Sequence, residues 1–212
     1  MKIIKYEHAC LVVEDHDKRL IIDPGNYVKS AITEVDNVVG LVITHVHADH
    51  FDPEHIKGII QKNPSIKIFC TGEVAKQLNI PGTKIVSEGE EAQIGSFRLR
   101  FYGKQHAPVH YSWPVAQNVG VLINDRLYYP GDSFTIPDVK VALLALPVSA
   151  PWLKLGETMD FLTAVKPSVA FPTHNALLSE VGEQMVDKIL GGIAKQNGGT
   201  FSPLAVGESI DT

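Results

Sequence analysis

The densest group of potential metal ligands in this chain lies within six residues. Residues 45–50 read His-Val-His-Ala-Asp-His, directly after an apolar segment, residues 38–44, that has the composition of a buried strand. Neutral imidazole and carboxylate are ligands that zinc and other borderline metals accept. With 9 histidines in 212 residues, a shuffled chain would contain this pattern about one time in a thousand. We therefore interpret the hexapeptide as part of a metal site and not as a loop of solvated histidines.

Further candidate ligands follow other strand-like segments of the chain. His106, Asp132 and His174 each stand where such a segment ends. Loops at strand ends are where metal and catalytic groups gather on a rigid sheet. His110 competes with His106 for the same ligand position. We favour His106 because it lies nearer the strand end, and His110 would then face the substrate.

Three other residues each have two interpretations. Asp23 precedes Pro24-Gly25, so it is either a turn former or a group that orients a neighbouring loop. Trp113 and Trp152 are of a type that more often packs than contacts a substrate, yet both follow candidate ligands or strand ends. We take residues 110–114 as the candidate substrate wall.

The remaining histidines and the cysteines carry no spacing typical of a site. We expect His16 and His55 to be exposed and leave His8 open, because it lies near a strand end. Cys10 and Cys70 lie in separate apolar segments, which predicts buried free thiols and neither a disulfide nor a ligand pair.

In their order along the chain, these motifs resemble the metallo-β-lactamase superfamily, and the resemblance covers nearly the whole sequence. It implies two divalent metal ions, with zinc as the first expectation and manganese or iron as alternatives. Asp23 would orient the metal-binding loop without binding a metal. The implied ligands are His45, His47 and His106 for the first ion, Asp49, His50 and His174 for the second, and Asp132 as a bridge between them.

The residues around two of the motifs give a second resemblance, which is to a narrower group of proteins and is less specific. The segments 130–133, Pro-Gly-Asp-Ser, and 150–152, Ala-Pro-Trp, look like small stand-alone hydrolases related to ascorbate-6-phosphate lactonase. Two ions about 3.5–4 Å apart would share a water, lower its pKa and stabilise the developing oxyanion. Asp49 would orient the resulting hydroxide and pass a proton to the leaving group.

These features predict a metal-dependent hydrolase of a small ester, lactone or related carbonyl compound. A phosphodiesterase is the close alternative, because the same ions serve carbonyl and phosphoryl centres. A phosphate would need a nearby cation, and only Lys29, Lys104 and Lys154 lie near the motif loops. A metal-binding scaffold protein without catalysis is the third hypothesis, and the full ligand set argues against it.

The pattern of elements predicts one α/β domain over residues 1–212, folded as a four-layer αββα sandwich. Asp52-Pro53 should begin a helix over 53–62, which places the hexapeptide between a strand and a helix. In the last predicted helix, 179–196, we expect Val181, Met185, Ile189 and Ile193 to face the core. The predicted strands are 2–7, 10–14, 19–23, 38–44, 66–70, 83–86, 92–104, 118–124, 126–130, 140–146 and 168–171, and the other predicted helices are 73–78 and 157–165.

Composition and charge limit the classes of partner that we expect this protein to bind. No apolar run approaches the roughly 20 residues of a membrane span, and residues 1–7 lack the apolar core of a signal peptide, so we expect a cytoplasmic protein. The net charge is −5 and no Lys/Arg run is present, so we expect a small-molecule substrate and no nucleic acid. The sequence does not indicate an oligomeric state.

Overall fold

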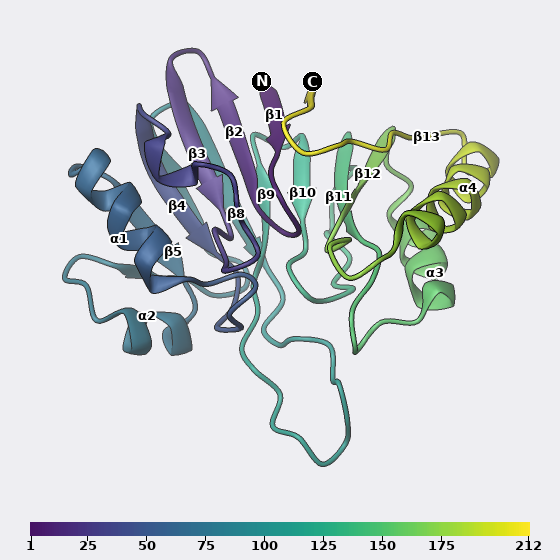
Figure 1. The fold of residues 1–212 in the computed structure, drawn as a ribbon, viewed down its shortest axis with the longest axis horizontal. Helices are drawn as coiled ribbons and strands as arrows, with labels where there is room; N and C mark the ends of the chain where they lie inside the picture. Colours follow the sequence, from purple (N-terminus) through teal and green to yellow (C-terminus); the bar gives the residue numbers. More distant parts are fainter.

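The computed structural model describes residues 1–212, which form four layers (Figure 1). Two seven-stranded sheets pack face to face in the middle. Helices α1 (Pro53–Lys62) and α2 (Gly72–Leu78) cover one outer face, and α3 (Leu155–Val165) and α4 (Glu180–Gln196) cover the other. The αββα sandwich expected from the sequence is therefore confirmed. No helix has both the length and the apolar character that a membrane crossing requires.

The first sheet is built mainly from the N-terminal half of the chain. Its strands are β1 (Lys2–Lys5), β2 (Leu11–Asp15), β3 (Lys18–Ile22), β4 (Val38–Ile43), β5 (Lys67–Cys70), β6 (Lys84–Ile85) and β14 (Ser209–Asp211). Their order is β14-β1-β2-β3-β4-β5-β6, with antiparallel pairing up to β3 and parallel pairing beyond it. A short 3-10 helix, η1 (Ile32–Glu34), precedes β4.

The second sheet repeats this pattern with the C-terminal half. Its strands are β7 (Glu91–Ile94), β8 (Phe97–Tyr102), β9 (Gly120–Ile123), β10 (Leu127–Tyr129), β11 (Leu143–Pro147), β12 (Val169–Thr173) and β13 (Thr200–Phe201). Their order is β13-β12-β11-β10-β9-β8-β7, antiparallel from β7 to β10 and parallel from β10 to β13. The strand predicted over 92–104 is in fact the β7–β8 hairpin, which turns at Gly95 with φ +55°.

Alternation along the strands divides the core into layers. In β4, Val42 faces the core between the sheets, while Leu41 and Ile43 pack beneath α1 and α2. In β3, Ile22 faces the other sheet and Ile21 faces the helices. Side chains of a strand alternate between its two faces, so each such strand contributes to two cores. This two-sided burial makes the central strands a rigid base for the loops at their ends.

Helix α1 begins where the sequence predicted. The Asp52 side chain accepts hydrogen bonds from the backbone N–H groups of Glu54 and His55, at 2.8 and 3.4 Å, and Pro53 is the first helical residue. The prediction that His55 is exposed is wrong. It is half-buried, because its Nδ1 lies 3.1 Å from the carbonyl oxygen of Gly25. His16 is exposed and both cysteines are buried free thiols, as expected.

The core face of α4 differs from the prediction. Val181 and Met185 are 75% and 54% exposed, whereas Val186 and Leu190 are 4% and 0% exposed. The helix packs on α3 and β13 with the stripe that contains Val186, Leu190 and Ala194. Both stripes have apolar residues four positions apart, so spacing alone could not decide which one the sheet and α3 would cover.

Candidate metal centre

The hexapeptide forms a tight turn between β4 and α1. The N–H groups of His50 and Phe51 both donate to the carbonyl of His47, at 3.0 and 2.9 Å. Gly25 packs directly behind this turn, where a Cβ atom would lie only 1.9 Å from the carbonyl oxygen of Asp49. Only glycine permits so close an approach, so the turn after β3 braces the hexapeptide from behind.

Two groups of side chains meet at this turn. His45 and His47 come from the hexapeptide, and His106 comes from the connection between β8 and β9; their candidate ligand nitrogens lie within 4.8 Å of one another. The ligand atoms of the second group also lie within 4.8 Å of one another, and its members are His8, Asp49, His50 and His174. His110 belongs to neither group. It is exposed, and its Nδ1 lies 2.7 Å from the Ser112 hydroxyl.

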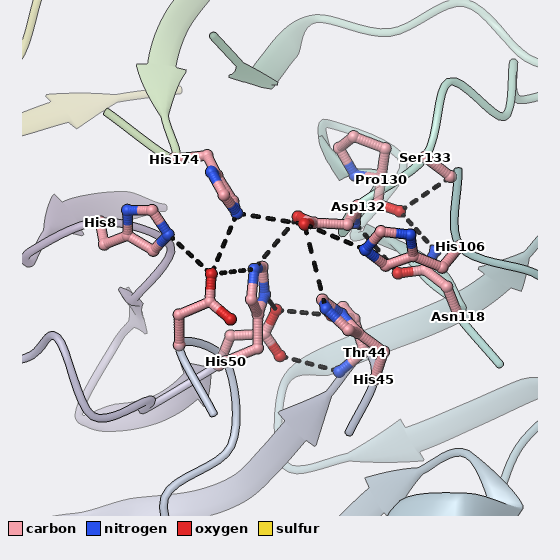
Figure 2. A network of polar contacts seen from close by, with 12 residues as sticks. His8, Thr44, His45, His50, His106, Asn118, Pro130, Asp132, Ser133 and His174 are labelled. Atoms are coloured by element: carbon pink, nitrogen blue, oxygen red, sulfur yellow. Dashed lines mark hydrogen bonds and ion pairs between the residues drawn. The ribbon is translucent and has the colours of Figure 1, made fainter. Parts of the chain in front are cut away.

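Asp132 lies between the two groups (Figure 2). Its Oδ2 is 3.3 Å from His106 Nε2 and 4.0 Å from His45 Nε2, on the side of the first group. Toward the second group, Oδ1 is 3.1 Å from His50 Nε2 and Oδ2 is 3.1 Å from His174 Nε2. Residues from both sheets thus converge on one carboxylate.

The hydrogen bonds of the imidazoles show whether this cluster fits metal ions. In four of them the Nε2 atom is buried without a hydrogen-bond partner: His45, His50, His106 and His174. The opposite ring nitrogens are all held, His45 Nδ1 by the Thr44 hydroxyl at 3.0 Å, His50 Nδ1 by Asp23 at 2.7 Å, and those of His106 and His174 by the backbone carbonyls of Ala107 and Ser149. An acceptor at Nδ1 keeps the proton there and leaves the Nε2 lone pair facing inward. Buried lone pairs aimed at a shared centre are what a cation requires, so the residues fit metal ions.

Asp23 organises this centre from outside. Its buried carboxylate accepts hydrogen bonds from the Thr44 N–H at 2.8 Å, the Thr44 hydroxyl at 2.6 Å, His50 Nδ1 at 2.7 Å and the Tyr129 hydroxyl at 2.9 Å. Because the Thr44 hydroxyl donates to Asp23, it accepts from His45 Nδ1. One carboxylate, fully engaged by four donors, therefore fixes the orientation of two imidazoles.

The pKa shifts of the cluster show that its carboxylates favour positive charge nearby. Burial would lower the pKa of His174, but the carboxylates of Asp132 and Asp49 outweigh burial and raise it to about 9. Burial favours the neutral acid of Asp49, yet the neighbouring imidazoles of His174, His8 and His50 hold its pKa below the usual range. Burial lowers the pKa of His45 far below its usual range. The buried carboxylates therefore favour positive charge at the centre, which in this structure is held as protons on imidazoles and which a metal ion could supply instead.

Two residues shape the site in ways that the sequence did not indicate. His8 is buried, and its Nε2 lies 3.1 Å from Asp49 Oδ2. Trp152, expected to pack or to face the substrate, donates its indole N–H to Asp132 Oδ2 at 2.7 Å and is 8% exposed. Both residues stand near strand ends, the same signal that selected the other ligands, but neither has a partner at a recognisable spacing.

A cavity of about 220 Å³ opens onto the centre. Trp113 and Trp152 line it, whereas His110 and Tyr111 do not. Much of the wall comes from the connection between β8 and β9, which projects from the body of the molecule (Figure 1). The cavity is lined by His47, Asp49, His106, Asp132 and His174 on the side of the cluster, and by Ala107, Pro108, Val109, Trp113, Pro114, Val115, Ala116, Pro151 and Trp152 on the other.

Comparison with known proteins gives the family. Residues 2–174 match the family described as the Beta-lactamase superfamily domain. The chain is 33% identical to Protein Rv0786c of Mycobacterium tuberculosis, over 84% of this chain and 86% of that protein. It is 28% identical to the UPF0173 metal-dependent hydrolase NEQ378 of Nanoarchaeum equitans, over 82% and 83% of the two chains.

A solved structure shares the architecture. Igni18, a metallo hydrolase from the archaeon Ignicoccus hospitalis, has a TM-score of 0.75 at 16% identity and covers 99% of this chain and 97% of its own. At that identity the match shows the fold alone. The narrower likeness to the ascorbate-6-phosphate lactonase branch stays a prediction. The family match spans most of the chain and includes every residue of the cluster around Asp132, so the chain belongs to the metallo-β-lactamase superfamily.

Proposed function

We propose that this protein is a metal-dependent hydrolase in which the cluster around Asp132 holds two divalent ions and a small ester, lactone or related carbonyl compound is cleaved. The observation that carries this proposal is the set of four buried Nε2 atoms that have no hydrogen-bond partner and surround Asp132. Relatives that bear the name metal-dependent hydrolase support the reaction class.

The two groups of side chains supply the two ligand sets. His45, His47 and His106 would hold one ion, Asp49, His50 and His174 the other, and Asp132 would lie between them. Zinc is the first expectation for such ligands, and manganese or iron would also fit. When bound, the ions would lower the pKa of a water and stabilise negative charge on the carbonyl oxygen.

Asp49 is the group placed to move protons. Its side chain is 23% exposed, whereas the side chains of His50 and Asp132 are 0% and 4% exposed. Asp49 also lines the cavity, so its carboxylate can accept a proton from the attacking water and deliver it to the leaving group. The Trp152 indole keeps Asp132 oriented through its hydrogen bond.

The cavity wall favours a carbonyl substrate over a phosphodiester. No Lys or Arg lines the cavity, and the residues outside the cluster are all apolar. Lys29 and Lys154 do not line it, and Lys104 lies 3.1 Å from Glu88. A phosphate would thus find no cation besides the ions themselves. An uncharged substrate with an apolar substituent would pack on Pro108, Val109 and Trp113.

A phosphodiesterase remains the second candidate, because two divalent ions would outweigh the charge of Asp49 and Asp132 and attract an anion by themselves. A scaffold that binds metal without catalysis is the third. We keep the expectations of a small-molecule substrate, no nucleic acid and a cytoplasmic location as part of this proposal, on the net charge of −5 and the absence of a basic run.

One assay separates these functions. Zinc-reconstituted protein is incubated with an uncharged lactone and, in parallel, with bis(p-nitrophenyl) phosphate, each with and without a chelator. The proposal predicts chelator-sensitive lactone opening and little phosphodiester cleavage. The reverse result makes the phosphodiesterase the function, and metal loading without turnover of either compound favours the scaffold. A His106→Ala variant should lose the activity, and a variant of the exposed His16 on the far turn, His16→Ala, should keep it.

A further inference from the structure

We propose that His8 is a positioning residue that fixes Asp49 and His174 for the second metal ion. This inference rests on the two-ion centre of the proposed function. His8 lies in the turn between β1 and β2, 37 residues or more from every other member of the cluster, and nothing in its local sequence marks it as a ligand.

The hydrogen bonds of His8 define which nitrogen carries its proton. The backbone N–H of Ala176 donates to His8 Nδ1 at 3.3 Å, so the ring proton lies on Nε2. Nε2 therefore donates to Asp49 Oδ2, at 3.1 Å. This is the reverse of His50 and His174, which are protonated at Nδ1 and present a free Nε2. In this arrangement His8 is a donor to a ligand and has no lone pair to offer a metal.

Asp49 Oδ2 is the atom that His8 controls. It lies 3.3 Å from His174 Nε2 and 3.8 Å from His50 Nε2, which makes it the meeting point of the second group. Asp49 is the most exposed carboxylate of the cluster, so without a partner its side chain could rotate into the cavity. The His8 N–H restricts that rotation, and His8 itself does not line the cavity.

The backbone of His8 positions His174 as well. His8 has φ +58° and His174 has φ +60°, in the left-handed region that L-residues rarely adopt. The N–H of His174 donates to the carbonyl of His8 at 2.9 Å, and the two ring centroids are 3.9 Å apart. The contact joins a turn of the first sheet to the end of β12 in the second.

The test compares metal stoichiometry in variants of His8. His8→Leu removes the donor to Asp49, and His8→Gln keeps an N–H donor on a side chain of similar reach. The matched control is His16→Leu, because His16 is also a histidine in a β-turn with φ +54° but is 81% exposed. Zinc per folded chain is measured after dialysis against buffers of graded free zinc, with circular dichroism to confirm folding.

We expect wild-type protein, His8→Gln and the control to bind two ions in the same range of free zinc. His8→Leu should keep the first ion and bind the second about 10- to 100-fold more weakly. If His8→Leu binds both ions as wild type does, the inference is wrong and the proposed function stands. If His8→Gln loses the second ion as well, His8 acts as a ligand or through packing, which also overturns it.

A double variant keeps the test decisive if His8→Leu folds poorly. His8→Ala also removes the donor, and His8→Ala/Asp49→Ala should bind the second ion no more weakly than Asp49→Ala alone, since His8 acts through Asp49. An additive loss would show that His8 contacts the ion itself. If wild-type protein fails to bind a second ion at all, the two-ion function fails and not the role of His8 alone.

Discussion

At the scale of single residues, the site is defined less by which histidines are present than by which of their nitrogens are engaged. Four imidazoles have Nδ1 held and Nε2 free, and His8 has the opposite arrangement. Asp23 imposes this pattern on His45 and His50 together, because it accepts from both Thr44 and His50. Outer contacts of this kind raise ligand basicity and fix the ring, so they are part of the metal site.

The role of Asp49 gives the first prediction at this scale. Asp49→Ala should lower kcat of the zinc-loaded protein by about 100-fold or more, since it removes both a ligand and the group that moves protons. His110→Ala should cost much less, because His110 is exposed and does not line the cavity. Steady-state kinetics of both variants on the same lactone would check this. Wild-type turnover by Asp49→Ala would show that the carboxylate has no such role.

The sequence could predict which residues form the cluster but not their surroundings. His45, His47, Asp49 and His50 share one hexapeptide, and the other predicted ligands follow strand-like segments. The contact of His8 with Asp49 spans 41 residues, and that of Trp152 with Asp132 spans 20. Such contacts depend on how the two sheets are packed, which no local pattern encodes.

At the scale of elements, the proposed function gives the connection between β8 and β9 the role of selecting which substrates reach the ions. It supplies His106 to the cluster and Trp113 to the apolar wall. Trp113→Ala should raise KM about tenfold for a substrate with an apolar substituent and change kcat little, because the ring contacts the substituent and not the reacting group. Tyr111→Ala is the matched control, as Tyr111 is 94% exposed on the same connection and does not line the cavity. Equal KM values for all three proteins would exclude this wall.

The packing of α4 gives a prediction on stability. Leu190→Ala should lower the free energy of unfolding by about 2–5 kcal/mol, because it opens a cavity beneath the helix. Met185→Ala should change it by less than about 0.5 kcal/mol, since Met185 is 54% exposed. Urea unfolding followed by circular dichroism would measure both. A larger loss for Met185→Ala would show that the helix face containing Val181 and Met185, which the spacing predicted, packs on the core.

Most elements were predictable, and the exceptions have physical causes. The start of α1 follows from Asp52 and Pro53, and the β9–β10 turn follows from Asn124 and Asp125, which both adopt positive φ. Strands β13 and β14 were missed because they have only two or three residues and form by pairing with β12 and β1. Short strands of this kind are determined by their partners and not by their own sequence.

At the scale of the whole molecule, the centre joins the two halves of the sandwich. The hexapeptide belongs to the first sheet, and His106, Asp132 and His174 follow strands of the second. Ions bound by the native state alone stabilise it by mass action, about 2.7 kcal/mol for each ion when free metal is 100 times its Kd. Removing both ions with a chelator should therefore lower Tm by roughly 10–20 °C for a domain of this size. Scanning calorimetry would show this, with zinc-saturated chelator as the control, and an unchanged Tm would mean that the native state binds no ions.

The central claim is that this cluster is a centre for two metal ions, and the most direct measurement is the number of ions per folded chain. Protein purified without chelators and dialysed against excess zinc would be analysed by inductively coupled plasma mass spectrometry. We predict two zinc ions per chain, and close to none in a variant that lacks both His45 and His174. A folded wild-type chain that holds no ion, or only one at saturating zinc, would contradict the two-ion centre.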